Sequence, residues 1–159
     1  MTELKKALYA GTFDPFTNGH LDIVNRSLKV FDEITIVIAV PPNKSPLFSK
    51  DQRVEMLNEL FKENSNVKID TWDGLIVDYA KKNKIPSIVR GLRPTGDFEI
   101  EFQMASMNQS LHAGIETFFL MTSGEHYFVS STLIREILKH SGDISPFVPK
   151  EIFNHINKK

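Results

Sequence analysis

The sequence predicts an α/β protein built on a parallel sheet of five strands, with helices on both faces. The first observation is that short apolar runs alternate along the chain with segments of helical periodicity. The second is that the run EITIVIAV, at 33–40, is rich in β-branched residues and almost entirely apolar, as a strand covered on both faces should be. Regular alternation of strands and helices favours a doubly wound, Rossmann-like sheet.

The expected strands are short apolar segments that each end in a turn or a loop. We place them at 5–10, 33–40, 66–72, 85–91 and 115–122. In sheets of this class, ligands bind beyond the carboxyl ends of the strands. The segments that follow the strands are therefore where a functional site is expected.

The expected helices show apolar residues three and four positions apart. Leu21, Val24, Leu28 and Phe31 predict a first helix at about 19–31. Ser49 and Gln52 resemble a capping box and predict the start of the second helix, whose apolar face carries Val54, Leu57, Leu60 and Phe61. Further helices are expected at 74–83, 97–113, 130–140 and 149–157. Within 97–113 we expect Phe98, Phe102 and Ala105 to face the core, with Leu111 as a weaker candidate.

The composition limits the classes of function. A chain of 159 residues with 41% hydrophobic residues suits one domain with a single core. A net charge of −1 gives no basic field for nucleic acid or an acidic membrane. The absence of cysteine excludes disulfides, thiolate catalysis and cysteine zinc sites. No apolar stretch approaches the roughly 20 residues that span a bilayer, and MTELKK does not resemble a signal peptide, so we expect a cytoplasmic protein.

An unusual turn follows the first strand, in the segment AGTFDPFTNGHLDIV at 10–24. It matches neither the dinucleotide fingerprint nor the P-loop, yet it too places glycine between a strand and a helix. Gly11 lets the backbone approach a ligand, and the helix N-terminus offers unpaired N–H groups to a phosphate. Thr12 and His20 stand on either side of the N-terminal end of that helix. His20 and Asn18 could merely cap the helix, but the combination favours a phosphate site.

Cationic residues follow two other strands. Arg90 and Arg93 flank Gly91 directly after an apolar run, so they can converge on one polyanion. The alternative is a pair of surface arginines, which the apolar run before Arg90 makes less attractive. Lys44 leaves the second strand at the same edge of the sheet as Thr12 and is a further phosphate candidate, although a lone loop lysine is usually solvated.

Three hydroxyl residues, Ser130, Ser131 and Thr132, stand where the helix after the fifth strand begins. Such residues routinely cap helices, and they can also form a second phosphate cradle. The histidines have no metal-ligand spacing, and no metal site is expected from protein side chains.

The segments GTFDPFTNGH, RGLR, DFEIE and VSSTLIRE resemble the bacterial phosphopantetheine adenylyltransferases. These belong to the nucleotidyltransferase superfamily with the T/H-x-G-H signature, here Asn18-Gly19-His20 with Thr12 upstream. That signature alone would indicate only the superfamily, whereas RGLR followed by DFE and SST-IRE is more specific. The resemblance runs from about residue 5 to about residue 155, and it implies one nucleotidyltransferase domain over 1–159.

The resemblance implies transfer of the adenylyl group of ATP to 4′-phosphopantetheine, the penultimate step of coenzyme A biosynthesis. The products would be dephospho-coenzyme A and pyrophosphate, and coenzyme A is a further ligand it implies. Mg²⁺ would accompany the triphosphate, and the assembly would be a homohexamer. Ile100 stands where the family often has tyrosine, and His126 where some members have tryptophan.

Site residues follow from the resemblance position by position. The catalytic residues would be His20, as transition-state stabiliser, with Thr12, Lys44 and Arg93. The residues that bind 4′-phosphopantetheine would be Thr12, Lys44, Ile76 and Arg90. The residues that bind ATP would be Thr12, Phe13, His20, Gly91, Leu92, Arg93, Glu101, His126, Tyr127, Phe128, Val129, Ser130, Ser131 and Thr132.

Two alternatives remain open at this point. The protein could be another adenylyl- or cytidylyltransferase of the superfamily, which RGLR with DFE argues against. It could also be a non-catalytic module that senses a nucleotide or coenzyme A, which the intact pair of Thr12 and His20 argues against.

Overall fold

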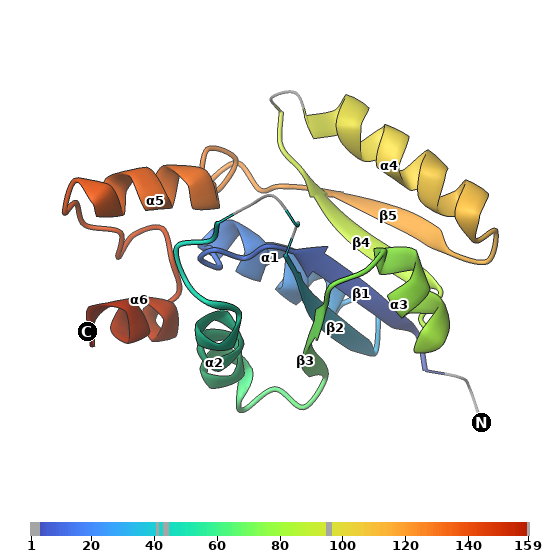
Figure 1. Ribbon diagram of the computed structural model, residues 1–159, viewed down its shortest axis with the longest axis horizontal. Coiled ribbons are helices and arrows are strands. Elements are labelled where there is room, and N and C mark those ends of the chain that lie inside the picture. Colours follow the sequence, from blue (N-terminus) through green and yellow to red (C-terminus); the bar gives the residue numbers. More distant parts are fainter. Residues whose placement is uncertain (1–3, 41, 43–44, 95–96, 159) are drawn as a thin grey trace.

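The computed structural model describes residues 4–40, 42, 45–94 and 97–158. Its strands form one parallel sheet in the order β3-β2-β1-β4-β5, which confirms the expected fold class (Figure 1). The strands are β1 Lys6–Gly11, β2 Glu33–Ala39, β3 Val67–Trp72, β4 Ser87–Leu92 and β5 Glu116–Met121.

The helices follow the strands in alternation. They are α1 Asn18–Ser27, α2 Lys50–Phe61, α3 Ile76–Lys82, α4 Asp97–Leu111, α5 Ser131–Lys139 and α6 Lys150–Asn157. The first helix ends four residues before the expected 31, because Lys29 and Val30 donate backbone hydrogen bonds over three residues in a tight turn that leads into β2. None of the helices within the described residues has the length and apolar character needed to cross a bilayer.

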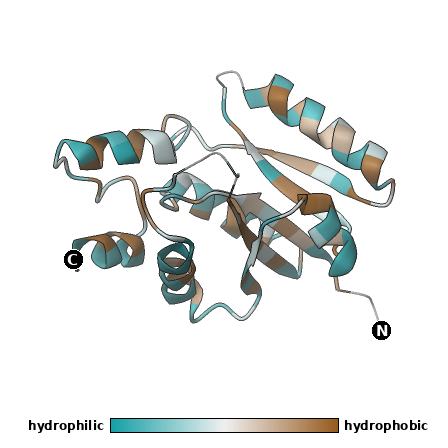
Figure 2. Ribbon diagram, in the orientation of Figure 1, coloured by the Kyte–Doolittle hydropathy of each residue, from teal (hydrophilic) through white to brown (hydrophobic). Residues whose placement is uncertain are grey.

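The sheet is covered on both faces, as its apolar strands require. Ala7 and Tyr9 of β1 join one apolar cluster with α1, α2, α5 and α6, whereas Leu8 and Ala10 join a second cluster with α3. Successive residues of a strand point to opposite faces, so this alternation assigns the helices to their layers. Figure 2 shows the result as mainly apolar strands in the centre, with helices of mixed hydrophobic and hydrophilic residues around them.

The orientation of α4 contradicts one prediction. Phe98, Phe102 and Leu111 were expected inside, but all three are exposed, and α4 has no fully buried residue. Glu101 and Ala105 are half-buried instead, and Ala105 lines a small cavity that also includes Ile76 of α3. Glu101 lies on the inner side because it pairs with Arg90 of β4, so an ion pair determines which side of α4 faces the sheet.

The strand order reverses between β1 and β4, because the chain goes from β1 outward to β2 and β3 and then returns to β4. A ligand site in a doubly wound sheet is expected outside the carboxyl ends of the strands at such a reversal. The ends of these two strands, Gly11 and Leu92, therefore mark the place for the site.

A substitution at Met56 tests how α2 packs in the core, at a distance from the expected site at the ends of β1 and β4. It is 1% exposed and lies in the larger cluster. We expect Met56→Ala to lower the free energy of unfolding by about 2–5 kcal/mol, because it removes buried methylenes and leaves a cavity. Urea unfolding measures the change. Val30→Ala, at a position 60% exposed, is the control and should stay within about 0.5 kcal/mol of the parent protein.

Candidate active site

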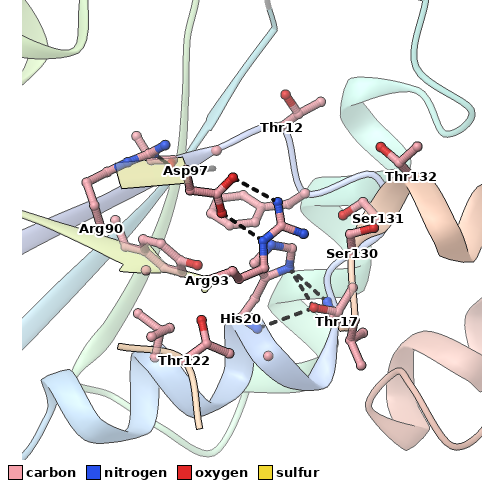
Figure 3. A pocket seen from close by; sticks show the side chains of 18 of the residues that line it. Thr12, Thr17, His20, Arg90, Arg93, Asp97, Thr122, Ser130, Ser131 and Thr132 are labelled. Atoms are coloured by element: carbon pink, nitrogen blue, oxygen red, sulfur yellow. Dashed lines mark hydrogen bonds and ion pairs between the residues drawn. The ribbon is translucent and has the colours of Figure 1, made fainter. Parts of the chain in front are cut away.

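A polar cavity of about 280 Å³ lies at the carboxyl ends of β1 and β4, bordered by the N-terminal ends of α1 and α5 (Figure 3). The elements that meet there are separated widely in sequence. β1 contributes Tyr9 to Gly11, β4 contributes Arg90 and Gly91, and α5 contributes Ser131 and Thr132. The cavity thus coincides with the strand reversal.

The turn after β1 has a tightly specified backbone. Phe13 has a φ of +50°, which is rare for a residue with a side chain. Its ring lies over Gly11, where an added Cβ would approach the ring to 2.9 Å. Gly11 is therefore required to make room for the Phe13 ring.

His20 exchanges hydrogen bonds with Thr17 at the start of α1. The backbone N–H of Thr17 donates to Nδ1 of His20 at 3.0 Å, and the hydroxyl of Thr17 accepts from the backbone N–H of His20 at 3.3 Å. The alternative interpretation, that His20 caps the helix, is thus correct for His20. It is wrong for Asn18, because Thr17 is the N-cap residue and the Asn18 side-chain amide donates to the Pro146 carbonyl at 3.1 Å instead. In the neutral imidazole, an accepting Nδ1 places the proton on Nε2. His20 lines the cavity and offers a ligand an N–H donor.

The environment keeps this imidazole neutral. Burial among Tyr9, Phe13 and Phe16 lowers the pKa of His20 to about 3, and the positive charges of Arg93 and Arg90 act in the same direction. The side chain is therefore a hydrogen-bond donor at neutral pH, and it does not add a third cation to the cavity.

Each arginine of the RGLR segment is held by a carboxylate of α4. Arg90 donates from Nε to Oε2 of Glu101 at 2.7 Å and from Nη2 to Oε1 at 2.5 Å, and its Nη1 donates to the Ala10 carbonyl at 2.6 Å. Arg93 donates to the carboxylate of Asp97 at 2.8 and 3.3 Å. These contacts fix both guanidinium planes beside the cavity.

The guanidinium of Arg90 stays protonated and positively charged. Burial disfavours it, but the hydrogen bonds and negative charge of Glu101 outweigh burial and leave the pKa of Arg90 above its ordinary value. A guanidinium has five N–H groups, and Arg90 uses three of them within the described residues. Two donors can therefore still meet a phosphate without breaking the ion pair.

The start of α5 uses its hydroxyls for structure. Ser130 caps the helix by accepting from the Leu133 N–H at 3.1 Å, which bears out the capping interpretation. Ser131 donates to the Pro15 carbonyl at 2.8 Å and so ties α5 to the turn after β1. The groups of α5 that are left to bind an anion are the backbone N–H groups of its first turn, at the positive end of the helix dipole.

The structure brings most of the predicted site residues to this one cavity. Its lining includes Thr12, Phe13, His20, Arg90, Gly91, Arg93, Glu101, Val129, Ser130, Ser131 and Thr132. Leu92 and the 126–128 segment are not among the residues that line it; Tyr127 and Phe128 are about half exposed. Lys44 lies outside the described residues. The roles of all these residues in binding stay predictions.

Ile76 borders a second, smaller cavity of about 40 Å³. Arg90, Glu101 and Ala10 line both cavities, so their shared wall is the ion pair between β4 and α4. The far side of that wall is more apolar, with Ile88, Met104 and Ala105 beside Ile76.

Comparison with known proteins agrees with this geometry. The model of the cytidylyltransferase-like family matches residues 8–137. The chain is 48% identical to a phosphopantetheine adenylyltransferase of Desulfatibacillum aliphaticivorans, over 98% of this chain and 89% of the relative. Enzymes of the same name from Caldanaerobacter subterraneus subsp. tengcongensis and Alkaliphilus metalliredigens are 44% and 40% identical, over 98% of this chain and 98% and 99% of theirs. The chain belongs to the phosphopantetheine adenylyltransferases.

Several residues at the site of this phosphopantetheine adenylyltransferase escaped the sequence analysis. Tyr9, Thr17, Ile23, Asp97 and Thr122 also line the cavity. Thr122 directly follows β5 and could have been found by the rule that located Thr12. Asp97 is the first residue of α4, where a carboxylate is common because it suits the helix dipole, so its position in the sequence gave no sign of the ion pair with Arg93. Tyr9 lies within an apolar strand, so the sequence around it indicates a core residue and not a residue of a polar site.

The depressed pKa of His20 makes a prediction about stability. The unfolded chain takes up a proton near pH 6.5, while the folded imidazole stays neutral to about pH 3. The free energy of unfolding should therefore fall as the pH drops below 6.5, with His20 contributing about 1–2 kcal/mol of the loss between pH 7 and pH 5. Urea unfolding at both pH values should show a smaller loss in His20→Asn. Any constant cost of the substitution cancels in that difference, and equal losses in both proteins would contradict the assignment.

Proposed function

We propose that this protein transfers the adenylyl group of ATP to 4′-phosphopantetheine, giving dephospho-coenzyme A and pyrophosphate, the penultimate step of coenzyme A biosynthesis. The observation that carries the proposal is one cavity in which a neutral histidine donor, two carboxylate-held arginines and two helix N-termini converge. Full-length relatives that bear the name of this activity support it.

The chemistry needs positioning more than proton transfer. The acceptor is a phosphate monoester that is already ionised at neutral pH, so its oxygen can attack the α-phosphorus of ATP without a general base. The bond from the α-phosphorus to the bridging oxygen breaks, and pyrophosphate leaves with the electron pair. Bringing two polyanions together and stabilising charge on the α-phosphate are then the main tasks.

The residues of the cavity suit those tasks. The Nε2–H of His20 donates to the α-phosphate oxygen that gains charge in the transition state, and the hydroxyl of Thr12 binds the reacting phosphates from the other side of the N-terminal end of α1. Arg93 and the N-terminal ends of α1 and α5 hold the triphosphate. A neutral donor is useful here because it needs no proton exchange with solvent during the reaction.

Arg90, with Lys44, holds the phosphate of 4′-phosphopantetheine. The pantetheine arm extends from that phosphate along the apolar surface beside Ile76, and the shared wall of Arg90 and Glu101 separates this surface from the side on which ATP binds.

Magnesium enters with the triphosphate. Within the described residues no group of three or more acidic or histidine side chains could hold a metal ion. The nearest carboxylates, of Asp97 and Glu101, are engaged with arginines. Mg²⁺ is commonly held mostly by substrate phosphates and water, which suits a cavity of this kind. The ion neutralises charge on the phosphates when it is bound.

The first experiment measures pyrophosphate release from ATP and Mg²⁺ with and without 4′-phosphopantetheine. We expect release only when the acceptor is present. His20→Ala should retain the fold and lose roughly 10²–10³ in kcat, about 2.7–4 kcal/mol, as when one donor is deleted from an oxyanion site. His20→Gln, which can return an N–H near the place of Nε2, should recover part of the loss.

Other outcomes separate the alternatives. ATP binding with no acceptor-dependent release would favour a nucleotide-sensing module. Release that occurs only with another acceptor would identify a different nucleotidyltransferase. A His20→Ala variant with the parent kcat would remove His20 from the mechanism.

We further infer that the protein works in the cytoplasm, where ATP is available, and assembles into a homohexamer. Support for self-association comes from α4, where Ile100, Met104, Met107 and Leu111 form an exposed apolar stripe at helical spacing. A single chain leaves such a stripe in water, and contiguous apolar surface of this kind commonly marks an interface. The number six rests on the family resemblance.

Met107→Glu tests this stripe. Met107 is 64% exposed, so the substitution should not perturb the folded chain, but a carboxylate buried at an interface without a partner is costly. We expect multi-angle light scattering to show a smaller particle than for the parent protein. Val30→Glu, at another exposed apolar position, should retain the parent mass. A parent protein that is monomeric at micromolar concentration would contradict self-association.

A further inference from the structure

The turn formed by residues 12–15, which carries Thr12 into the cavity, is held from outside by three side chains. Its carbonyl groups accept hydrogen bonds at Thr12 from Arg53 at 2.6 Å, at Asp14 from Arg135 at 2.8 Å, and at Pro15 from Ser131 at 2.8 Å. Arg135 and Ser131 belong to α5, whose start borders the cavity. Arg53 belongs to α2 and is not among the residues that line the cavity.

Arg53 is an unusual component of this arrangement because it is a charged side chain that is only 1% exposed. Its Nε donates to the carbonyls of Phe48 and Ser49 at 3.0 and 3.3 Å, while its Nη1 donates to Thr12. One guanidinium therefore joins the segment just before α2 to the 12–15 turn, two segments that are more than thirty residues apart.

Asp14 makes the reciprocal connection. Its carboxylate, in a residue only 2% exposed, accepts the backbone N–H groups of Leu47 at 2.7 Å and Phe48 at 2.9 Å. A carboxylate on the turn thus holds the 47–48 backbone, and an arginine beyond that backbone holds the turn. The two buried charges bind the same two segments in opposite directions.

The turn needs external support because of Phe13. With a φ of +50°, this residue occupies a backbone region that disfavours side chains, and such strain persists only where the surroundings over-determine the conformation. Thr12 precedes Phe13 directly. A shift of the turn would therefore move the Thr12 hydroxyl relative to His20.

We propose that Arg53 is a positioning residue for adenylyl transfer, which fixes Thr12 through its carbonyl and, together with Asp14, couples the 12–15 turn to the 47–49 segment. This inference rests on the proposed function. It extends the site to α2, and it joins the turn that carries Thr12 to the 47–49 segment.

Stability alone is a poor reason for this arginine. Its Nη2 is the one buried side-chain nitrogen or oxygen without a hydrogen-bond partner among the described residues. A buried charge with an unsatisfied donor is a cost that apolar packing would avoid. The geometry that Arg53 imposes on two backbone segments at once is what an apolar side chain could not supply.

Steady-state kinetics with both substrates tests the proposal. Arg53→Lys retains the charge but cannot bond both segments, and we expect kcat to fall about 10- to 100-fold, since an ångström of displacement can cost that much. The KM for ATP should stay within about threefold, because ground-state contacts from the arginines and helix ends remain. Asp14→Asn can still accept one N–H but repels the other, so it should raise the KM for 4′-phosphopantetheine by about tenfold and change kcat less.

Met56→Ala is the matched control, because Met56 lies three residues further along α2 and touches neither segment through a hydrogen bond. It should destabilise the protein and leave kcat and both KM values unchanged when assayed well below its melting temperature. If Met56→Ala loses as much kcat as Arg53→Lys, or if Arg53→Lys retains the parent kcat, the positioning role is wrong.

Amide hydrogen exchange tests the coupling between the two segments without measuring adenylyl transfer. The amides of Leu47 and Phe48 should exchange at least tenfold faster in Arg53→Lys than in the parent, relative to the Ile36 amide in the central sheet. An unchanged ratio would overturn the coupling. A parent protein that releases no pyrophosphate would refute the proposed function, and the exchange ratio would still decide whether Arg53 couples the two segments.

Discussion

The hydrogen bond from the Thr17 backbone to Nδ1 of His20 is the interaction on which the site depends. It belongs to the capping box that starts α1, so the same contact fixes where the helix begins and which imidazole nitrogen carries the proton. If the helix started one residue later, His20 would lose both its acceptor role and its orientation. The surrounding aromatic rings then keep the imidazole neutral. The capping box that starts α1 thereby also determines which nitrogen of His20 donates into the cavity.

A second contact, the ion pair between Arg90 and Glu101, organises the other side of the molecule. It aligns α4 on β4, separates the two cavities, and turns Ile100 and Met107 toward solvent. The prediction that Phe98 and Phe102 face the core failed for this reason. Periodicity records which residues share a side of a helix, but α4 has apolar residues around much of its circumference. In such a helix the partner of one half-buried carboxylate, that of Glu101, decides the rotation.

The features of this fold that its sequence predicts share a physical basis. Strands and helices were found because alternation of apolar runs is a local signal, and the site was found because parallel strands bring the residues after them to one edge. Arg53 carried no such signal. In the sequence it is one of several charged residues on a helix, and only the fold shows that it is buried against carbonyls from two distant segments. Tyr9 could not be found for a different reason, since it lines the cavity from within an apolar strand, where the sequence pattern indicates only a core residue.

The electrostatic design of the cavity follows from the charge of its ligands. Two arginines close together repel one another, and the carboxylates of Glu101 and Asp97 offset that repulsion while they hold the guanidinium planes. A third cation in the same space would raise the repulsion again, and the low pKa of His20 avoids it. When polyanions enter, their negative charge offsets the field of the two arginines around His20. Burial, the largest cause of the low pKa of His20, does not depend on that charge, so the imidazole remains a neutral N–H donor. The carboxylates thus offset the repulsion between the arginines, and the phosphates of the ligands meet donors that are already held in place.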